Sequence, residues 1–500
     1  MSLTYSVAFR GVEACPVEVQ CSLSPGLPGF SIVGLPDKAV SEAKERVRAA
    51  LASMAIAFPS KKVTINLSPA DLPKEGSHFD LPIAVSLLAA LDVIPQDVTQ
   101  SLISLGELSL DGKLVPVTGA LPAAMTAAEE EFMLLCPKAC GKEAAWVSNT
   151  KVISAGNLGD VLRHFTGQSP LADATPGEVQ GAVNTMDLQD IKGQERAKRA
   201  LEVAAAGRHN FLMVGTPGSG KSMLAHRLPG ILPPLTAREA LETSMIHSVA
   251  GLLDEGGISR ERPFRDPHHT SSMAAIIGGG RLAKPGEVSL AHNGVLFMDE
   301  FPEYPRNVLE TLRQPLESGT VMISRANAHV KYPCRFMLVA AANPCKCGYM
   351  PEPERACARV PMCGEEYLGR VSGPLMDRFD IRIDVPPVAY ADLDLPRSGD
   401  TSAQVAERVA AAHQVQAERY DEMQGMRSNA DAAGEILEKT AAPDDEGRSL
   451  LVRAAERFHL SARGYHRVLR VARTIADLDH SLAVRRPHIA EAISFRMGNP

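Results

Sequence analysis

The amino-acid sequence predicts an α/β protein of several domains with a parallel-sheet core, and three observations predict it. A short apolar run, 211–214, is typical of a buried strand and leads into a glycine-rich loop and then a helix. A second apolar strand, 295–298, ends in two acids. Helical patterns follow a proline-rich break at 386–387 and continue toward the C-terminus. The strand–loop–helix order in the middle of the chain is typical of parallel sheets flanked by helices.

The glycine-rich loop fits the pattern G-x-x-x-x-G-K-[ST], which binds the phosphates of nucleoside triphosphates. Glycines let the backbone wrap round the phosphates, and the loop N–H groups and the positive end of the next helix face them. Lys221 is predicted to reach the β- and γ-phosphates and Ser222 to bind magnesium. A glycine-rich turn that binds nothing is the alternative, but the flanking strand and helix favour a nucleotide site. The predicted binding residues are Gly215, Thr216, Pro217, Gly218, Ser219, Gly220, Lys221 and Ser222.

Polar residues that follow two further strands complete the predicted site. Asp299 is placed to hold magnesium, directly or through water, and Glu300 to polarise the attacking water. Asn343 ends a buried strand and can orient that water beside the γ-phosphate, although an Asn-Pro turn alone would be structural. Together, the loop and the two acids indicate an ATPase that uses ATP and Mg²⁺.

Length, composition and charge limit the classes of protein to which this chain can belong. The 500 residues suffice for roughly two to four domains. Because no apolar run reaches roughly 18 residues and the first ten residues lack a secretory pattern, we expect a cytoplasmic protein without membrane contact. The nine cysteines are an odd number, which favours a reducing cytosol over a disulfide framework. With a formal charge of −7, any DNA binding requires a local basic lining, such as a pore in an oligomer.

Residues 1–165 mix strands and helices. The patterns predict strands over 29–35 and 62–67, helices over 37–54 and 79–91, and a hairpin over 102–117 with its turn at Asp111-Gly112. Residues 166–186 lack periodicity and carry glycine, proline, serine and acids, so they are predicted to be a linker.

This first part resembles the N-terminal domain of the magnesium-chelatase-like AAA+ ATPases of the ComM and YifB type, in the stretches 30–36, 66–71, 74–77 and 79–84. The resemblance implies an N-terminal Lon-protease-like α/β domain over 1–165. Lon-type proteolysis needs a Ser–Lys dyad. Ser77 lies near the position of the Lon serine, but the stretch 116–122 has no lysine where Lon has one, which implies a non-proteolytic scaffold or DNA-contacting module. Lys113 and Lys138 leave a rearranged dyad open.

The same resemblance implies an AAA+ P-loop ATPase core with a parallel sheet over 187–386. In AAA+ proteins the stretch matching 190–194 helps enclose the adenine. Residues 263–294 are similar to the hairpin insert that magnesium-chelatase motors share with the MCM helicases, which points into the pore of a hexamer. Arg281 and Lys284 are therefore candidates to touch a phosphate backbone, with solvated loop charges as the alternative. Adjacent histidines at 268 and 269 favour hydrogen bonding or packing over zinc.

Four cysteines follow the sensor strand with the spacing C-x-C-x9-C-x5-C. Four thiolates in one loop can close a tetrahedral structural zinc site, although the spacing differs from paired C-x-x-C motifs and free thiols are the alternative. The family tends to carry cysteines here. The predicted zinc ligands are Cys345, Cys347, Cys357 and Cys363.

Two groups of arginines are predicted to act on the nucleotide. Residues 370–380 are close to the family's ISGPLLDRIDI stretch, which implies an arginine finger that reaches the γ-phosphate of a neighbouring subunit. Arg378 is the predicted finger and Arg370 the second candidate, with a local salt bridge as the alternative. Residues 387–500 correspond to a C-terminal helical lid, in which the family returns an arginine to the nucleotide. Arg463 matches that position and Arg467 is the alternative, while a solvated basic face would need neither.

Because the finger acts on a neighbour, the resemblance implies a homo-oligomeric ring, expected to be a hexamer. The function it implies is an ATP-driven helicase or branch-migration translocase on single-stranded or branched DNA, independent of base sequence, in recombination or natural transformation. A chaperone-like motor that remodels a protein partner or a metal-chelatase complex is the second hypothesis, and a Lon-like protease the third.

Overall fold

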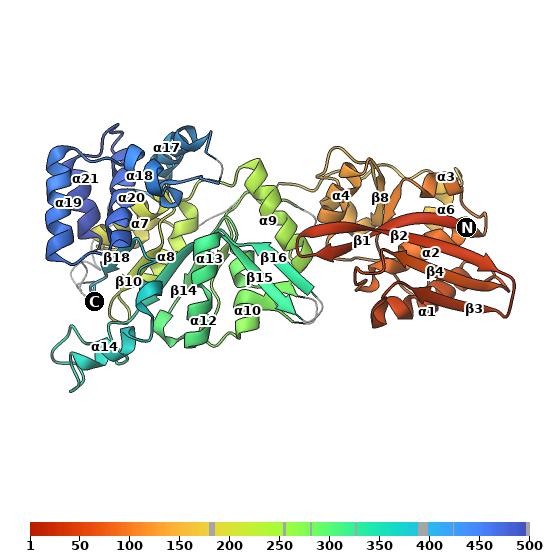
Figure 1. Cartoon of the computed structure of the whole chain (residues 1–500), viewed down its shortest axis with the longest axis horizontal. Coiled ribbons are helices and arrows are strands. Elements are labelled where there is room, and N and C mark those ends of the chain that lie inside the picture. Colours follow the sequence, from red (N-terminus) through yellow and green to blue (C-terminus); the bar gives the residue numbers. More distant parts are fainter. Residues whose placement is uncertain are drawn as a thin grey trace.

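The computed structural model describes residues 1–179, 186–253, 257–280, 283–325, 328–388, 399–423 and 425–496. Arg281, a candidate for DNA contact, lies outside these ranges. The molecule is elongated, with the N-terminal part at one end and the nucleotide-loop part and the C-terminal helices at the other (Figure 1). In the described ranges, no helix has both the length and the apolar character that crossing a bilayer requires.

The N-terminal part is built on a seven-stranded mixed sheet. The β1–β2 and β2–β4 pairs are antiparallel and the other pairs parallel. Val63, Ile65 and Leu67 are fully buried at alternate positions of β4, as expected where one face of a strand packs on helices. In spatial order the strands are β3 (Gly29–Val33), β4 (Lys62–Ser68), β2 (Glu13–Ser24), β1 (Ser2–Arg10), β5 (Leu102–Ser104), β8 (Met133–Pro137) and β9 (Val152–Ala155).

The predicted helices of this part are confirmed, and the predicted hairpin is confirmed only in part. α1 begins where the Asp37 side chain accepts the Val40 N–H, a normal N-cap. In the predicted hairpin, β5 joins the large sheet instead, and only β6 (Glu107–Leu108) and β7 (Leu114–Val115) pair with each other. The helices are α1 (Lys38–Ser53), α2 (Asp80–Ala90), α3 (Gln96–Thr99), α4 (Ala120–Glu129), α5 (Lys138–Ala144) and α6 (Leu158–Phe165).

The predicted parallel sheet is present in the middle of the chain. All four of its strand pairs are parallel, so the carboxyl ends of the strands meet at one edge. Its three central strands are apolar and almost wholly buried, as is usual for a parallel sheet covered on both faces. In spatial order they are β11 (Phe264–Arg265), β14 (Val295–Met298), β17 (Met337–Ala342), β10 (Phe211–Val214) and β18 (Ile381–Asp384).

Helices cover both faces of this sheet. One face packs against α7 and the C-terminal helices, and the other against α12 and the β15–β16 hairpin. Around the sheet lie α7 (Glu195–Gly207), α8 (Lys221–Arg227), α9 (Ala237–Ala250), α10 (Met273–Ile277), α11 (Glu287–Leu290), α12 (Arg306–Thr311), α13 (Arg313–Ser318), α14 (Met362–Leu368) and α15 (Gly373–Met376), with hairpins β12 (Gly278–Gly279)–β13 (Lys284–Pro285) and β15 (Thr320–Arg325)–β16 (Ala328–Pro333).

The C-terminal part of the described chain is helical, as predicted. Its longest helices, α17 and α20, pack on α7, so these helices and the parallel sheet share one hydrophobic core. The helices are α17 (Ser402–Tyr420), α18 (Gly434–Thr440), α19 (Asp445–Arg457), α20 (Ala462–Leu478) and α21 (Arg486–Ser494).

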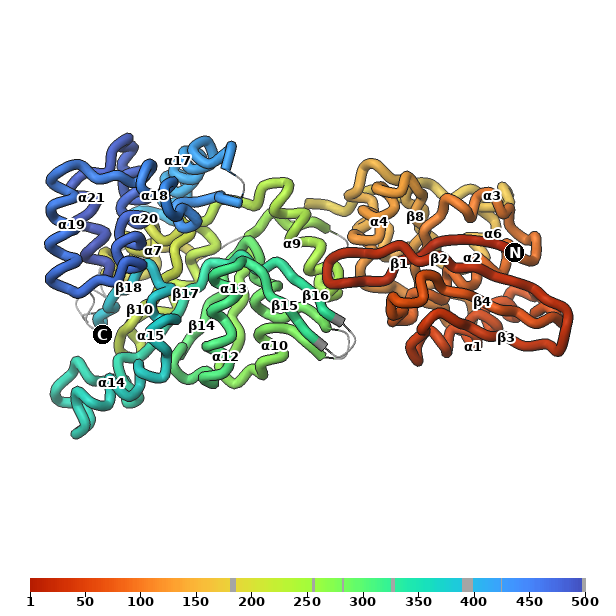
Figure 2. The backbone as a smooth tube through the Cα atoms, viewed as in Figure 1, coloured from red at the N-terminus to blue at the C-terminus, as the bar shows by residue number. Residues whose placement is uncertain are grey.

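Among the described residues, the N-terminal part touches the rest of the molecule through helices α4 and α5 and the β1–β2 turn. Helix α4 packs against α9, and the Ser248 hydroxyl of α9 donates to the Glu143 carboxylate of α5. The β1–β2 turn lies against β16, so closely that a Cβ at Gly11 would come within 2.9 Å of Val330. In the backbone trace, α9 and β16 both lie at the end of the second lobe that faces the first (Figure 2).

Candidate active site

The phosphate loop leaves the end of β10 and is held by its neighbour β17, since the Gly215 N–H donates to the Ala342 carbonyl at 3.1 Å. Gly218 and Gly220 have φ of +79° and +91°, a left-handed conformation that side chains rarely adopt. Space around both is open, so backbone conformation and not crowding requires glycine there. The Thr216 hydroxyl is buried and has no hydrogen-bond partner among the described residues.

Lys221 points back over the loop. Its Nζ donates to the carbonyls of Gly215 at 2.8 Å and Thr216 at 2.9 Å, and lies 3.4 Å from Oδ1 of Asn343. The side chain is 7% exposed. Burial lowers the pKa of Lys221, and the charges of Asp299 and Glu300 oppose that shift. The structure therefore brings the predicted lysine and the predicted sensor residue together at the loop.

The two acids after β14 lie at the same edge of the sheet. The Ser222 hydroxyl donates to Oδ2 of Asp299 at 2.7 Å. The Glu300 backbone has a positive φ of 49°, and its N–H donates to Oδ1 of Asp299 at 2.8 Å. The Glu300 carboxylate lies 3.1 Å from Nδ1 of His269, which follows the edge strand β11. His269 is thus a site residue whose place beside Glu300 sequence reasoning missed, while hydrogen bonding of the two histidines is confirmed.

These side chains fit a triphosphate with magnesium. The loop supplies N–H groups and an ammonium for phosphate oxygens, and the unpartnered Thr216 hydroxyl can still make a hydrogen bond. Ser222 and Asp299 supply the hard oxygen ligands that magnesium prefers. Gln194 borders the loop, with its Nε2 3.4 Å from the Ser219 carbonyl, so the stretch predicted to enclose adenine lies beside it.

The four predicted zinc ligands gather in the loop after β17. Sγ of Cys345 lies 3.1 Å from Sγ of Cys347, and the Cys363 thiol hydrogen-bonds with those of Cys357 and Cys345. Thiolates around zinc, with Zn–S bonds of about 2.3 Å, would lie about 3.8 Å apart. No set of three or more His, Cys, Asp or Glu side chains in the described ranges has the arrangement of a metal site. The cysteine cluster is therefore observed, and zinc stays a prediction.

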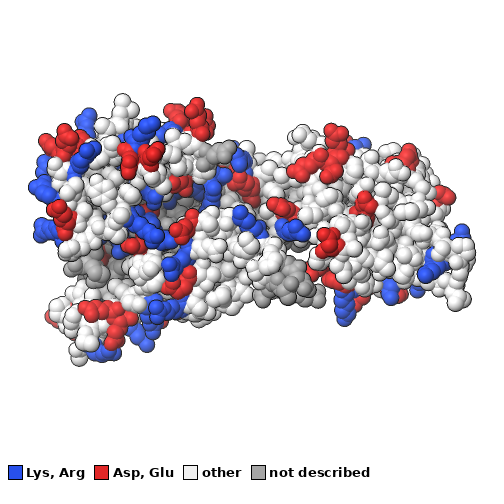
Figure 3. Space-filling model, viewed as in Figure 1, with Lys and Arg blue, Asp and Glu red and all other residues white. Residues whose placement is uncertain are grey.

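A cavity of about 560 Å³ lies at the opposite edge of the parallel sheet from the phosphate loop. Asn210, Met337 and Asp380 line it, and these residues lie at the amino ends of β10, β17 and β18. The four residues of β10 separate it from the loop by about 13 Å. Lysines and arginines gather around the hollow between the sheet and the C-terminal helices (Figure 3). The described charged lining residues are Arg208, Arg335, Arg378, Arg427, Arg463, Arg467, Arg470, Glu317, Asp380 and Asp431.

The predicted finger and the predicted lid arginines meet in this cavity. Arg378 is largely buried, and its guanidinium donates to Glu317 at 2.9 Å and to the Pro374 carbonyl at 3.2 Å. Arg467 donates to the Arg378 carbonyl at 3.0 Å and pairs with the buried Asp380. Arg463 is exposed at the rim. None of these three side chains lies at the phosphate loop of its own chain, because the sheet stands between them.

The second finger candidate, Arg370, and the candidate for contact with a phosphate backbone, Lys284, lie outside the cavity. Arg370 pairs with Glu303 at 3.1 Å, just beyond the acids that follow β14, and does not line the cavity. Lys284 is exposed on β13 of the insert hairpin.

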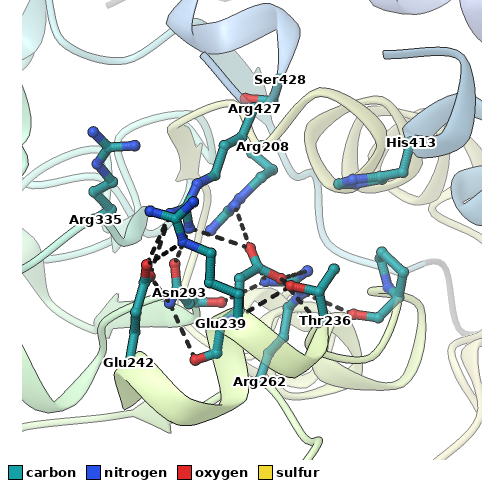
Figure 4. A network of polar contacts seen from close by, with 12 residues as sticks. Arg208, Thr236, Glu239, Glu242, Arg262, Asn293, Arg335, His413, Arg427 and Ser428 are labelled. Carbon is teal, nitrogen blue, oxygen red and sulfur yellow. Dashed lines mark hydrogen bonds and ion pairs between the residues drawn. The ribbon is translucent and has the colours of Figure 1, made fainter. Parts of the chain in front are cut away.

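A network of ion pairs that includes two cavity-lining residues, Arg208 and Arg427, ties the C-terminal part to α9. Arg427 donates to Glu242 at 3.2 Å and to Asn293 at 3.2 Å, while Arg208 and Arg262 both pair with Glu239 (Figure 4). Helix α9 also carries Ser248, which contacts the N-terminal part. One helix therefore joins the arginine cavity to the N-terminal sheet domain.

Three family models match successive parts of the chain. They are "Subunit ChlI of Mg-chelatase" over residues 17–139, "Magnesium chelatase, subunit ChlI" over 187–393 and "Magnesium chelatase, subunit ChlI C-terminal" over 399–496. Together with the phosphate loop, they define the class of the protein as a magnesium-chelatase-like AAA+ protein. That class implies ATPase activity with ATP and Mg²⁺.

Full-length relatives narrow the class. The chain is 44% identical over 502 residues to the competence protein ComM of Haemophilus influenzae, with 99% of this chain and 97% of that protein covered. It is 40% identical over 499 residues to YifB of Escherichia coli, with the same coverage of 99% and 97%. The 38 kDa magnesium-chelatase subunit of Rhodobacter capsulatus is 25% identical over 62% of this chain and 86% of that protein. The chain belongs to the ComM/YifB family of magnesium-chelatase-like AAA+ proteins.

Proposed function

We propose that this protein is an ATP-driven ring motor that acts on DNA, in the manner of a branch-migration translocase or helicase. The arginine cavity carries the proposal. It holds more cationic than acidic side chains, and it lies across the sheet from the only nucleotide loop that the motifs predict in this chain. Its arginines can serve a triphosphate only when a second copy presents its loop, so the site is complete only in an oligomer, expected to be a hexamer.

The mechanism follows from the two halves of that shared site. Bound Mg²⁺, held by Ser222 and Asp299, would neutralise phosphate charge. Lys221 would bind the phosphate oxygens after leaving the Gly215 and Thr216 carbonyls. Glu300 is placed to take the proton of the attacking water, and Asn343 to orient that water. Arg378 of one copy would then stabilise the transition state in the next, an effect worth about 10³–10⁵ in rate where an arginine acts in trans.

We propose DNA as the substrate because of the family relationship and because of an exposed lysine on the β12–β13 hairpin. The Haemophilus influenzae relative is a competence protein, which points to transforming DNA. The formal charge of −7 leaves no general attraction for nucleic acid, so contacts must be local. Lys284 on the β12–β13 hairpin is an exposed cation suited to phosphate contact, and nothing identified reads bases. We therefore propose a single-stranded or branched, sequence-independent DNA substrate in the cytoplasm.

A chaperone-like motor is the second candidate. The similarity to the 38 kDa magnesium-chelatase subunit, a component of a metal-inserting complex, favours it. In that case ATP turnover would respond to a protein partner instead of DNA.

We propose that residues 1–165 form a Lon-like but non-proteolytic domain, separated by the 166–186 linker from an AAA+ core over 187–386 and a lid over 387–500. The Ser77 hydroxyl donates to Glu107, and Lys113 pairs with Asp111 at the surface. Lys138 is exposed, and the buried Lys74 donates to the Pro69 carbonyl. Each hydrogen bond directs these groups away from a Ser–Lys dyad, which would pair hydroxyl with amine.

The cysteine loop is proposed to hold one structural zinc ion, supported by the gathering of its four thiols. Elemental analysis of the purified protein tests this directly. One zinc per chain, lost in Cys357→Ser, is expected, and zinc-free protein from zinc-supplemented cells would contradict it.

Subunit mixing tests the shared site. Lys221→Ala removes the loop lysine and Arg378→Ala removes the finger, so each variant alone should lack ATP turnover. A mixture should recover turnover, because a Lys221→Ala subunit can lend its Arg378 to an intact loop. The Lys221→Ala, Arg378→Ala double variant is the matched control and should restore nothing when mixed with either. No recovery in the first mixture would contradict the proposal.

A further inference from the structure

The turn from Cys345 to Gly348 lies directly against the phosphate loop. Gly348 has φ of +85°, and a Cβ built on it would come within 2.6 Å of Cγ and 2.7 Å of Cδ of Pro217. Such a separation is shorter than any van der Waals contact, and the pyrrolidine ring of Pro217 has no rotamer in which to move away. Glycine at 348 is therefore required by close approach as well as by backbone conformation.

The turn Cys345–Gly348 is held by a hydrogen bond of its own, by burial of Cys345 and by packing of helix α14. The Gly348 N–H donates to the Cys345 carbonyl at 3.0 Å, and Cys345 is fully buried beside the Cys347 thiol. Helix α14 packs back on the start of the same loop, because a Cβ at Gly364 would lie 3.0 Å from the Pro344 carbonyl. The turn is thus a packed element and not a free surface loop.

The same segment reaches the phosphate loop at a second point. Asn343, two residues before Cys345, places Oδ1 3.4 Å from the Lys221 amine. Pro217 and Lys221 lie near the two ends of the phosphate loop, so one short segment contacts the loop on both sides. Close-packed groups of this kind pass small shifts to one another, because no free volume absorbs them.

We propose that the turn Cys345–Gly348 is a wedge that holds the phosphate loop in its nucleotide-binding conformation, with Gly348 as the positioning residue. The inference rests on the proposed function, since it takes the loop 215–222 as the ATP site. It gives the cysteine loop a role in nucleotide binding whether or not a metal occupies its thiols.

Nucleotide affinity of the full-length Gly348→Ala variant tests the wedge. The probe is a fluorescent ATP analogue with Mg²⁺, and the matched control is Gly167→Ala. Gly167 has a similar φ of +75° but nothing within 4 Å of a built Cβ, so it reports backbone strain without the contact. We expect Gly348→Ala to weaken binding by about tenfold, which corresponds to about 1.4 kcal/mol, and Gly167→Ala by less than about twofold.

A rescue experiment separates positioning from general damage. Pro217→Ala removes the ring that the new methyl group would strike, so Gly348→Ala should cost less than about threefold in a Pro217→Ala background. A cost that is the same in both backgrounds would overturn the wedge, as would equal affinities for Gly348→Ala and Gly167→Ala. If the wild type itself bound no nucleotide, the proposed function would fail instead, so the two failures are distinguishable.

Discussion

Replacing Asp380 with asparagine should destabilise the core around the arginine cavity. The carboxylate is buried, pairs with the Arg467 guanidinium and accepts the Asn210 backbone N–H at 3.2 Å. Asparagine keeps the shape but removes the charge, which leaves Arg467 with no counter-ion while its Nε already lacks a partner among the described residues. Breaking a buried ion pair costs about 3–5 kcal/mol, and we place this change at the lower end because the amide oxygen still accepts hydrogen bonds.

The loss of stability in Asp380→Asn should depend on pH in a defined direction. Burial alone would raise the pKa of Asp380, but the charge of Arg467 and the nearby His209 outweigh it and hold the pKa well below its usual 3.8. A carboxylate with a depressed pKa contributes its full stability above the unfolded pKa and loses it as the pH falls toward the folded value. The difference between wild type and Asp380→Asn should be largest at neutral pH and shrink below about pH 4.

Thermal unfolding of the full chain, followed by circular dichroism at stepped pH, measures this effect. Asp377→Asn is the matched control, because its half-exposed carboxylate lies 3.7 Å from Arg496 and should contribute less than about 1 kcal/mol. Equal losses for the two variants at neutral pH would refute the reasoning. So would a loss in Asp380→Asn that stays the same down to about pH 3.

Two further variants test contacts that hold the site. His269→Ala should lower ATP turnover by about tenfold with little change in nucleotide affinity, since the histidine touches Glu300 and not the phosphate loop; equal losses in both would contradict this. Ser248→Ala leaves the half-buried Glu143 carboxylate with the Leu121 N–H alone, so subtilisin should cleave the 166–186 segment about fivefold faster than in the exposed-site control Ser148→Ala. Unchanged cleavage would show that this contact does not hold the two parts together.

Elements with strong local signals were predictable from the sequence. The loop 215–222 is defined by its own pattern, and the helix predicted over 37–54 by helical spacing. The meeting of Lys221, Asp299 and Asn343 could also be foreseen, because parallel strands bring their carboxyl ends to one edge. These predictions needed only short-range pattern and the geometry of one sheet.

The contacts that the sequence analysis did not predict depend on packing between segments far apart in the chain. His269 reaches Glu300 because β11 pairs with β14, and a two-residue strand is too short for periodicity to show. Leu102–Ser104 is buried beside β1 and β8, so it leaves the predicted hairpin for the large sheet. Arg467 joins Arg378 because α20 packs on α7 at the far edge of the parallel sheet. Whether the lid arginines act on a nucleotide stays a prediction. Their position favours action on the nucleotide of a neighbouring subunit and not on that of their own chain.

The most direct test of a DNA motor is ATP turnover of the purified protein, alone and with single-stranded or four-way-junction DNA, at low and high salt. We predict stimulation by DNA that fades as salt rises, because phosphate contacts lose the free energy of counterion release. Lys221→Ala should be inactive under every condition. Turnover that ignores both DNAs at low salt would contradict the DNA motor and favour the protein-remodelling alternative.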